Sequence, residues 1–253
     1  MERFTSSDGV EIAYDVWGSG SGPPVVLHHG FSADAIVNWV GPGVVDALVA
    51  AGRLVVALDA RGHGRSGKPH DPAAYGETIM ARDLSALVDR LDAPSVDLVG
   101  YSMGAIVSLI AATEDPRVRR LVVGGVGAAV VELGGVDTRV LPPAVVVDAL
   151  TTDDPAAITD RWGAEFRAFA DAVGADRRAL AAQAAAVHAA PIPLDRITAP
   201  TLVLAGDDDP LAARPSVLAD AIPSAEVRML TGDHLAAVGD PAFASSIVEF
   251  LAR

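Results

Sequence analysis

The chain has no cysteine, few aromatic residues and few basic ones. Without cysteine it has no disulfide, thiolate nucleophile or cysteine-ligated metal site, and it fits a reducing compartment such as the cytoplasm. Aromatic residues make up 5% of the chain and hydrophobic residues 51%, so we expect a core of valine, leucine, isoleucine and alanine. Residues 1–8 lack the apolar segment of a signal peptide, and no apolar run approaches the roughly 18 residues of a membrane-spanning helix. We predict a cytoplasmic protein that does not bind membranes.

Acidic residues outnumber basic ones by 33 to 19, which gives a formal net charge of −14 at pH 7. No cluster of lysine and arginine interrupts this acidic background. Nucleic acids and anionic membrane surfaces repel such a chain, so neither is expected as a partner. The expected partner is a small-molecule substrate.

Three short apolar runs, with helix-compatible stretches between them, indicate a parallel β-sheet. The runs lie at residues 24–29, 54–59 and 96–101. They are rich in valine and leucine and lack polar alternation, which is typical of strands buried on both faces. Helices are expected at 44–51 and 77–91, and the alternation of strand and helix indicates the α/β class. Residues 3–5 and 10–17, on either side of a Ser-Asp-Gly turn, predict an antiparallel hairpin.

A helical segment interrupts this alternation. Residues 128–193 are alanine-rich and helix-compatible and contain no strand pattern. The alternation resumes with strands at 199–206 and 226–230 and helices at 214–221 and 241–251. We predict one core domain made of residues 1–127 and 194–253, with helices on both faces of a mostly parallel sheet, and an inserted helical layer at 128–193.

A Gly-x-Ser-x-Gly sequence at residues 100–104 lies between a predicted strand and a predicted helix. The motif alone is weak, because glycine and serine are common and serine is a frequent helix cap. Its position is more informative, since reactive residues of open parallel sheets gather beyond the carboxyl ends of the strands. A serine nucleophile also needs a base, an acid that orients the base, and N–H donors for the oxyanion. Ser102 is the candidate nucleophile.

The base is expected among six histidines. We favour His234, because it lies in a loop after the last predicted strand. The other histidines lie in turns, at a strand end or in the inserted layer: His28, His29, His63, His70 and His188. Of these, His28 and His29 are candidates for a substrate pocket, and His188 either lines it or faces solvent. We expect His63 in a packing or hydrogen-bonding role and His70 in solvent.

The acid is expected at a strand end between the serine and the histidine. Three consecutive aspartates, Asp207, Asp208 and Asp209, follow the strand at 199–206, whereas no carboxylate follows the strand at 121–123 before Glu132. A solvated acidic turn or a loose cation site is the alternative for these aspartates. Adjacent aspartates lack the spaced ligands of a calcium loop, and we predict no metal.

Two backbone N–H groups are candidates for the oxyanion donors. One belongs to Met103, at the start of the helix after Ser102, and the other to Phe31, which follows Gly30 in a tight turn. The glycine-rich residues 18–22 open a strand rather than a helix, so phosphate binding is not expected there. We predict no cofactor.

These features together make the chain resemble the α/β-hydrolase fold superfamily over essentially its whole length. The resemblance rests on His29-Gly30-Phe31, Gly100 to Gly104, Gly206 to Pro210 and His234, in that order, and on Asp59 to Pro69, which is similar to that family's Asp-x-Arg-Gly-x-Gly-x-Ser-x-x-Pro segment. In the family the acid stands three residues after the glycine that ends its strand, which implies Asp209. Two departures are Asp233, where glycine commonly precedes the histidine, and the doubled His28-His29.

The resemblance also implies a cap over the site, for which residues 128–193 are the candidate. Residues expected to line the pocket are Phe31, Met103, His29 and Trp39 from strand ends, and Trp162, Phe166 and His188 from the cap. This set predicts a small, largely apolar substrate.

Hydrolysis of a carboxylic ester or lactone through an acyl-enzyme is the leading hypothesis for the reaction. Ser102 rather than aspartate at the motif argues against haloalkane dehalogenase and epoxide hydrolase chemistry, which use a carboxylate nucleophile in similar proteins. Alternatives on the same three side chains are carbon–carbon bond hydrolysis, cofactor-free haloperoxidase or perhydrolase activity, and acyl transfer. A ligand-binding protein without catalysis is a further alternative.

Overall fold

One eight-stranded β-sheet runs through the computed structural model, which describes residues 1–253. The strands are β1 (Glu2–Thr5), β2 (Glu11–Trp17), β3 (Val25–His28), β4 (Val55–Asp59), β5 (Val96–Tyr101), β6 (Val118–Gly124), β7 (Thr201–Gly206) and β8 (Ala225–Leu230). Their spatial order is β1-β2-β4-β3-β5-β6-β7-β8. The pairs β1–β2 and β2–β4 are antiparallel, and all other neighbouring pairs are parallel. The predicted fold class is confirmed.

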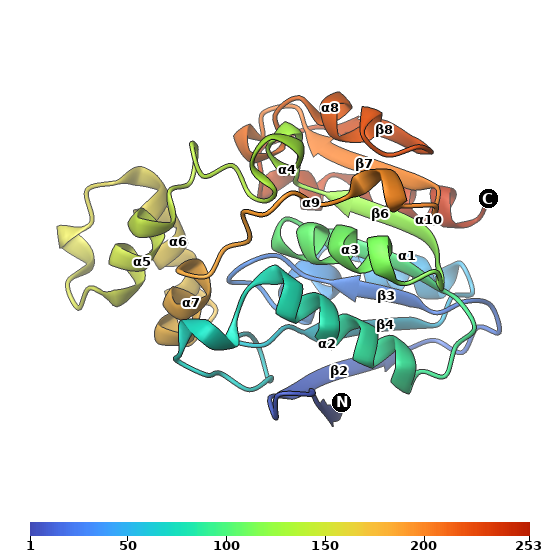
Figure 1. The fold of residues 1–253 in the computed structure, drawn as a ribbon, viewed down its shortest axis with the longest axis horizontal. Helices are drawn as coiled ribbons and strands as arrows, with labels where there is room; N and C mark the ends of the chain where they lie inside the picture. Colours follow the sequence, from blue (N-terminus) through green and yellow to red (C-terminus); the bar gives the residue numbers. More distant parts are fainter.

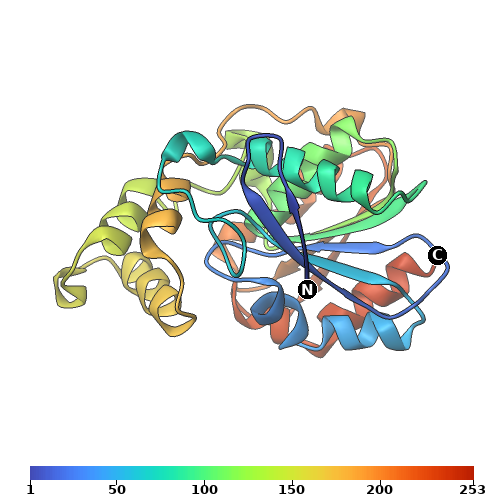
Figure 2. The ribbon, with the colours of Figure 1, turned by 90° about the horizontal axis from the view of Figure 1, so that it is seen from below.

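Helices cover both faces of the sheet, with α2 and α3 on one face and α1 and α10 on the other (Figures 1 and 2). The helices of the core are α1 (Val44–Ala50), α2 (Glu77–Arg90), α3 (Met103–Glu114), α8 (Pro215–Asp220), α9 (Ala236–Gly239) and α10 (Pro241–Leu251). Short helical turns lie at Ile36–Val40, Pro72–Ala74, Pro155–Ala157, Leu194–Arg196 and Pro210–Ala212. No helix is both long and apolar enough to cross a membrane.

The strands β3, β4, β5 and β7 are buried at every position, and they are mostly apolar because both faces of the sheet are covered there. Along β3, Val26 packs into the cluster beneath α2 and α3, whereas Val25 and Leu27 pack into the cluster with α1 and α10. Alternate side chains of a strand point to opposite faces, so a strand with both faces covered needs apolar residues at every position. This double burial explains the continuous apolar runs in the sequence.

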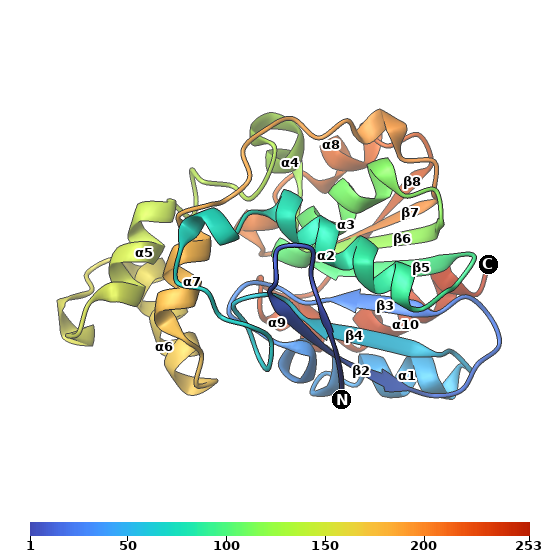
Figure 3. The ribbon, with the colours of Figure 1, turned by 60° about the horizontal axis from the view of Figure 1, so that its bottom comes forward.

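The chain between β6 and β7 is helical. Its helices are α4 (Ala128–Leu133), α5 (Pro143–Thr151), α6 (Arg161–Ala172) and α7 (Arg177–Ala184). Helix α4 packs against α8 beside the sheet, whereas α5, α6 and α7 form a separate group beyond one end of the sheet (Figures 1 and 3). That group has its own apolar cluster, which includes Leu150, Ala170 and Leu180.

Candidate active site

Ser102 occupies the sharp turn between β5 and α3. Its backbone has φ 53° and ψ −117°, a combination that is costly for a residue with a side chain. The Ser102 N–H donates a hydrogen bond to the carbonyl of Gly124 at the end of β6, 2.7 Å away. The turn therefore holds the serine in a strained conformation at the carboxyl end of the sheet, where the sequence predicts a nucleophile.

The glycines on either side of Ser102 allow backbone segments to come into contact. A Cβ on Gly104 would lie 2.1 Å from the carbonyl oxygen of His28, and a Cβ on Gly100 would lie 2.2 Å from that of Gly104. Either atom would push α3 away from the sheet. The motif thus reflects the packing of α3 onto β3 as well as the turn itself.

A chain of hydrogen bonds links Ser102, His234 and Asp209. The Ser102 Oγ lies 2.9 Å from Nε2 of His234, and Nδ1 of His234 lies 2.8 Å from Oδ2 of Asp209. The Asp209 side chain is fully buried, and its Oδ1 accepts a hydrogen bond from the Leu211 N–H at 2.9 Å. A carboxylate at Nδ1 keeps the proton on that nitrogen, which leaves Nε2 free to accept the serine proton.

The neighbouring carboxylates face elsewhere. Asp207 accepts a hydrogen bond from the Gly232 N–H at 2.7 Å, and Asp208 is exposed. Asp233, beside the histidine, accepts hydrogen bonds from the N–H groups of Ala236 and Leu235, which lower the pKa of its carboxyl. Asp209 alone of the three consecutive aspartates contacts His234. No group of three or more histidine or carboxylate side chains is arranged to hold a metal ion.

The loop that carries His234 is fixed to the sheet by Tyr101. The Tyr101 hydroxyl donates a 2.6 Å hydrogen bond to the carbonyl oxygen of His234, and burial raises the pKa of Tyr101, which keeps this donor protonated. A Cβ on Gly206 would lie 2.2 Å from the Gly232 carbonyl oxygen. The loops of Asp209 and His234 therefore meet backbone to backbone.

The N–H groups of Phe31 and Met103 donate no hydrogen bond within the chain. Gly30 lies against the serine, because a Cβ placed on it would be 3.3 Å from the Ser102 Cβ. The Gly30 N–H donates to Oδ1 of Asn38 at 2.8 Å, which fixes the turn that carries Phe31. Two free N–H donors thus flank the serine, as an oxyanion site requires.

Buried neutral histidines support this turn from behind. His29 hydrogen-bonds through Nδ1 to the Gly30 carbonyl at 2.8 Å and accepts the Ala60 N–H through Nε2 at 2.9 Å. His63 accepts the Ser32 N–H at 3.1 Å. Burial lowers the pKa of both imidazoles, so both nitrogens that accept are unprotonated. His29 is fully buried in this role and does not line the pocket, contrary to expectation.

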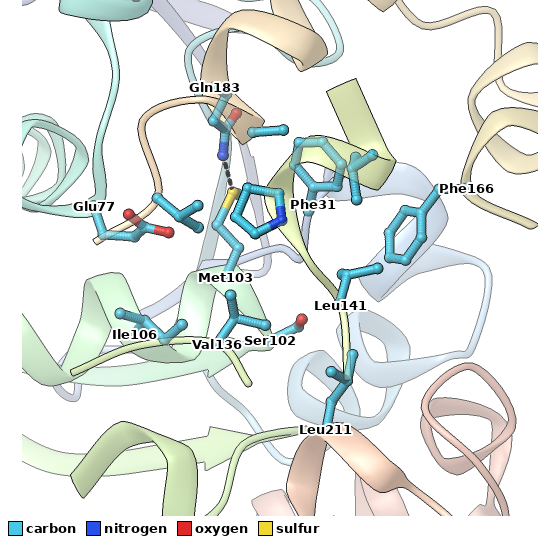
Figure 4. Close-up of a pocket in the computed structure, with 14 residues that line it drawn as sticks. Phe31, Glu77, Ser102, Met103, Ile106, Val136, Leu141, Phe166, Gln183 and Leu211 are labelled. Carbon is cyan, nitrogen blue, oxygen red and sulfur yellow. Dashed lines mark hydrogen bonds between the residues drawn. The ribbon is translucent and has the colours of Figure 1, made fainter. Parts of the chain in front are cut away.

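A small cavity opens beside Ser102, between the sheet and the helices α5 to α7 (Figure 4). Ten of its 14 lining residues are hydrophobic. They include Phe31, Met103, Ile106, Val136, Val146 and Phe166. Apart from Ser102, the polar side chains in the lining are Glu77 and Gln183. The cavity suits a small, mostly apolar molecule.

Three further residues expected at the pocket do not line it. Trp39 is fully buried on the opposite face of the sheet, where its ring stacks on Phe243 with centroids 6.3 Å apart. Trp162 packs within the apolar cluster of α5 to α7. The ring of His188 lies outside the cavity, 3.3 Å from the Thr78 hydroxyl. The sequence does not indicate where these three side chains point, because that depends on how distant elements pack.

Sequence reasoning missed the polar lining residues Glu77 and Gln183, as well as most of the apolar lining. Glu77 begins α2, where an acidic residue is common because it interacts favourably with the helix dipole. Gln183 lies in an alanine-rich stretch of α7 with no motif around it. Only the packing of α7 near the start of α2 brings both side chains to one cavity.

Comparisons with known proteins agree with this fold. The profile of a family described as the alpha/beta hydrolase fold matches residues 23–132. The protein RutD of Variovorax paradoxus is 31% identical, and the alignment covers 96% of both chains. The crystal structure of the enol-lactonase from Burkholderia xenovorans LB400 covers 100% of both chains with a TM-score of 0.81 and 25% identity.

Other relatives match over a shorter length. A non-heme chloroperoxidase of Streptomyces lividans is 36% identical over 48% of this chain, and a 2-hydroxy-6-oxo-2,4-heptadienoate hydrolase of Pseudomonas putida is 37% identical over 53%. These alignments span 43% and 48% of the two relatives' own lengths. Several of these relatives are hydrolases, which supports the view that this protein is a hydrolase as well. The chain belongs to the alpha/beta hydrolase fold family.

Proposed function

We propose that this protein is a serine hydrolase that cleaves a small carboxylic ester or lactone through an acyl-enzyme. The observation that carries the proposal is the hydrogen-bond chain from the Ser102 hydroxyl through His234 to the buried Asp209, with distances of 2.9 and 2.8 Å. A hydroxyl becomes a useful nucleophile at neutral pH when an oriented imidazole takes its proton.

In the proposed reaction, Ser102 attacks the substrate carbonyl while His234 takes its proton. The carbonyl oxygen becomes an oxyanion that accepts hydrogen bonds from the N–H groups of Phe31 and Met103, each worth on the order of 3 kcal/mol in the transition state. His234 then returns the proton to the leaving alcohol, and the acyl group stays on Ser102. Water, activated by His234, releases the acid, and Asp209 stabilises the imidazolium that forms in both steps.

The helices beyond the sheet form the other wall of the proposed substrate site. We propose that the segment predicted as a cap, residues 128–193, acts through α5 to α7, since α4 packs beside the core. Phe166 from α6 and Phe31 from the oxyanion turn lie with ring centroids 5.8 Å apart, so the cap and the core both contribute to the cavity lining. The full-length likeness to an enol-lactonase supports a lactone or ester substrate.

Hydrolysis of p-nitrophenyl esters and of lactones tests the proposal. We expect the Ser102→Ala variant to lose at least about 10⁴-fold in kcat/KM. Ser245→Ala, at an exposed serine on α10, is the matched control and should retain wild-type turnover. Equal turnover by the Ser102→Ala variant and the wild type would overturn the proposal.

The partial matches to a chloroperoxidase and to a heptadienoate hydrolase favour two second candidates on the same side chains, perhydrolysis and carbon–carbon bond hydrolysis. Two further assays separate them: the same ester assays with added peroxide, and an assay with 2-hydroxy-6-oxo-2,4-heptadienoate as the substrate. A larger kcat/KM for either reaction than for every ester and lactone would replace ester hydrolysis as the main activity.

A further inference from the structure

Two buried polar side chains face the apolar cavity away from Ser102. Gln183 from α7 is 4% exposed and Glu77 from α2 is 3% exposed, and both line the cavity. Figure 4 shows them on a different side of the cavity from the Ser102 hydroxyl. Buried polar groups normally have hydrogen-bond partners, so the partners of these two decide what they do.

The amide oxygen of Gln183 has no partner. Its Nε2 donates to the sulfur of Met103, and a thioether only accepts, so the carbonyl oxygen must face the other way. That Oε1 atom is buried without a hydrogen bond. An acceptor in this position fits a ligand that brings a donor into the cavity.

Glu77 is only partly satisfied. Its Oε2 accepts the N–H of His188 at 2.7 Å, and the other donor at this carboxyl is the backbone N–H of Glu77 itself. No lysine or arginine pairs with this carboxyl, and burial raises the pKa of Glu77. A single hydrogen bond to His188 does not require a carboxyl group, because a glutamine would accept it equally well.

We propose that Gln183 and Glu77 determine specificity by binding a hydroxyl group on the part of the substrate that fills the cavity. The inference rests on the proposed function and names the substrate class of that same site, a hydroxy-substituted ester or lactone. The hydroxyl donates its proton to Oε1 of Gln183, and its oxygen accepts a hydrogen bond from the Glu77 carboxyl in the protonated form that burial favours. A hydrocarbon would leave both side chains without a partner.

A hydroxyl fits better than an ammonium group. Ten of the 14 lining residues are hydrophobic, and a charged amine loses far more hydration than a neutral hydroxyl in such surroundings. The Gln183 contact with Met103 also fixes the amide next to a predicted oxyanion donor. Binding the distal hydroxyl would therefore align the scissile carbonyl.

Matched pairs of esters test the inference. Each pair consists of a p-nitrophenyl ω-hydroxyalkanoate and the alkanoate in which a methyl group replaces the hydroxyl, over a graded range of chain lengths. A second series uses acetates of ω-hydroxyalkyl and alkyl alcohols, in case the alcohol part fills the cavity. We expect the wild type to prefer the hydroxyl ester by about tenfold or more in kcat/KM at one length of one series.

Three variants sharpen the test. Gln183→Leu keeps the side-chain size but removes the acceptor, and should reverse the preference toward the methyl ester. Glu77→Gln keeps the acceptor for the His188 N–H and should reduce the preference by a smaller factor. Val146→Ala, in the apolar lining, is the control and should change both esters of a pair together and leave their ratio intact. Turnover of the alkanoates by Gln183→Leu shows that the variant is folded.

The outcomes separate this inference from the proposed function. Ser102-dependent hydrolysis of the alkanoates with no gain from the hydroxyl in either series would overturn the inference and leave the function standing. A preference that persists unchanged in Gln183→Leu would overturn it as well. Absence of Ser102-dependent turnover of every ester would remove both.

Discussion

Around Ser102 the backbone of one element touches the backbone of the next, whereas the helices of the group α5 to α7 contact one another through side chains. A Cβ on Gly100, Gly104 or Gly206 would come within 2.2 Å of a carbonyl oxygen. In α6, a Cβ on Gly163 would lie 3.2 Å from the Cβ of Ala149, a tight contact that a shift of a few tenths of an ångström relieves. Where two backbones touch, only glycine fits, whereas many residue types can pack where side chains touch.

The polar contacts of the two regions differ in the same way. At the strand ends, hydrogen bonds fix single atoms of His234, of Asp209 and of the turn that carries Phe31. In the helical group, the buried Arg167 donates to the carbonyl oxygens of Ala149 and Thr152 and so fastens α6 to α5 as a unit. In the proposed function, the first region positions the reacting atoms and the second shapes the cavity that holds the substrate. Substitutions should therefore affect kcat in the first region and KM in the second.

The largest effect is expected from a one-atom change at the strand ends. Asp209→Asn should lower kcat about 10³- to 10⁴-fold, because an amide no longer holds the proton on Nδ1 of His234. Asp208→Asn, at an exposed aspartate next to it, is the control and should stay within about twofold of wild type. Steady-state ester hydrolysis measures both. The acid assignment is wrong if Asp208→Asn or Asp207→Asn causes the larger loss.

The same glycine substitution in the two regions tests the comparison directly. Gly104→Ala should lower the free energy of unfolding by roughly 3 kcal/mol or more, since its Cβ would lie 2.1 Å from the His28 carbonyl oxygen. Gly163→Ala should change it by less than about 1 kcal/mol, because a small side-chain shift is offset by the higher helix propensity of alanine. Urea unfolding of both variants measures the difference. Equal losses would show that the two regions are equally constrained.

A smaller effect is expected from pH, and it should arise at the strand ends. Burial lowers the pKa of His28 to about 3 and also lowers the pKa values of His29 and His63. The unfolded chain, with an ordinary histidine pKa near 6.5, takes up these protons first as the pH falls. Stability is therefore complete above pH 6.5 and declines below it. His28 alone should lower the free energy of unfolding by about 1.6 kcal/mol between pH 6.5 and pH 5.

Urea unfolding at pH 7, 6 and 5 measures this decline. Glu77 contributes in the opposite direction, because its raised pKa favours the folded state at lower pH, so Glu77→Gln should steepen the decline. A free energy of unfolding that stays constant from pH 7 to pH 5 would contradict the role given to the buried histidines.

The smallest effect is expected in the helical group. Phe166→Ala should raise KM about fivefold with little change in kcat, because the ring contacts ground state and transition state alike. Phe169→Ala, on the same helix but outside the cavity lining, is the matched control and should leave KM near the wild-type value. A loss in kcat for Phe166→Ala would mean that the cap positions reacting atoms as well.

The two regions also differ in how far sequence predicts them. The doubly covered strands and the glycines around Ser102 follow from local rules, so the sheet, its hairpin and the contact of Ser102, His234 and Asp209 could be anticipated, although the catalytic roles stay predictions. The lining of the cavity could not be predicted in this way. Trp39 and Phe166 are both aromatic residues on helical turns, and only tertiary packing decides that one stacks on Phe243 and the other lines the cavity. Gln183 has no sequence signal, because its partner lies on another element.

Labelling with a fluorophosphonate tests the central claim most directly, since the reagent reacts with a serine that an oriented histidine has activated. Intact-mass and peptide analysis should find one adduct, on Ser102, in the folded wild-type protein. No adduct should form with Ser102→Ala, and labelling should be strongly slowed in His234→Ala. A folded wild-type protein that forms no adduct, or one that carries it on another residue, would contradict the account.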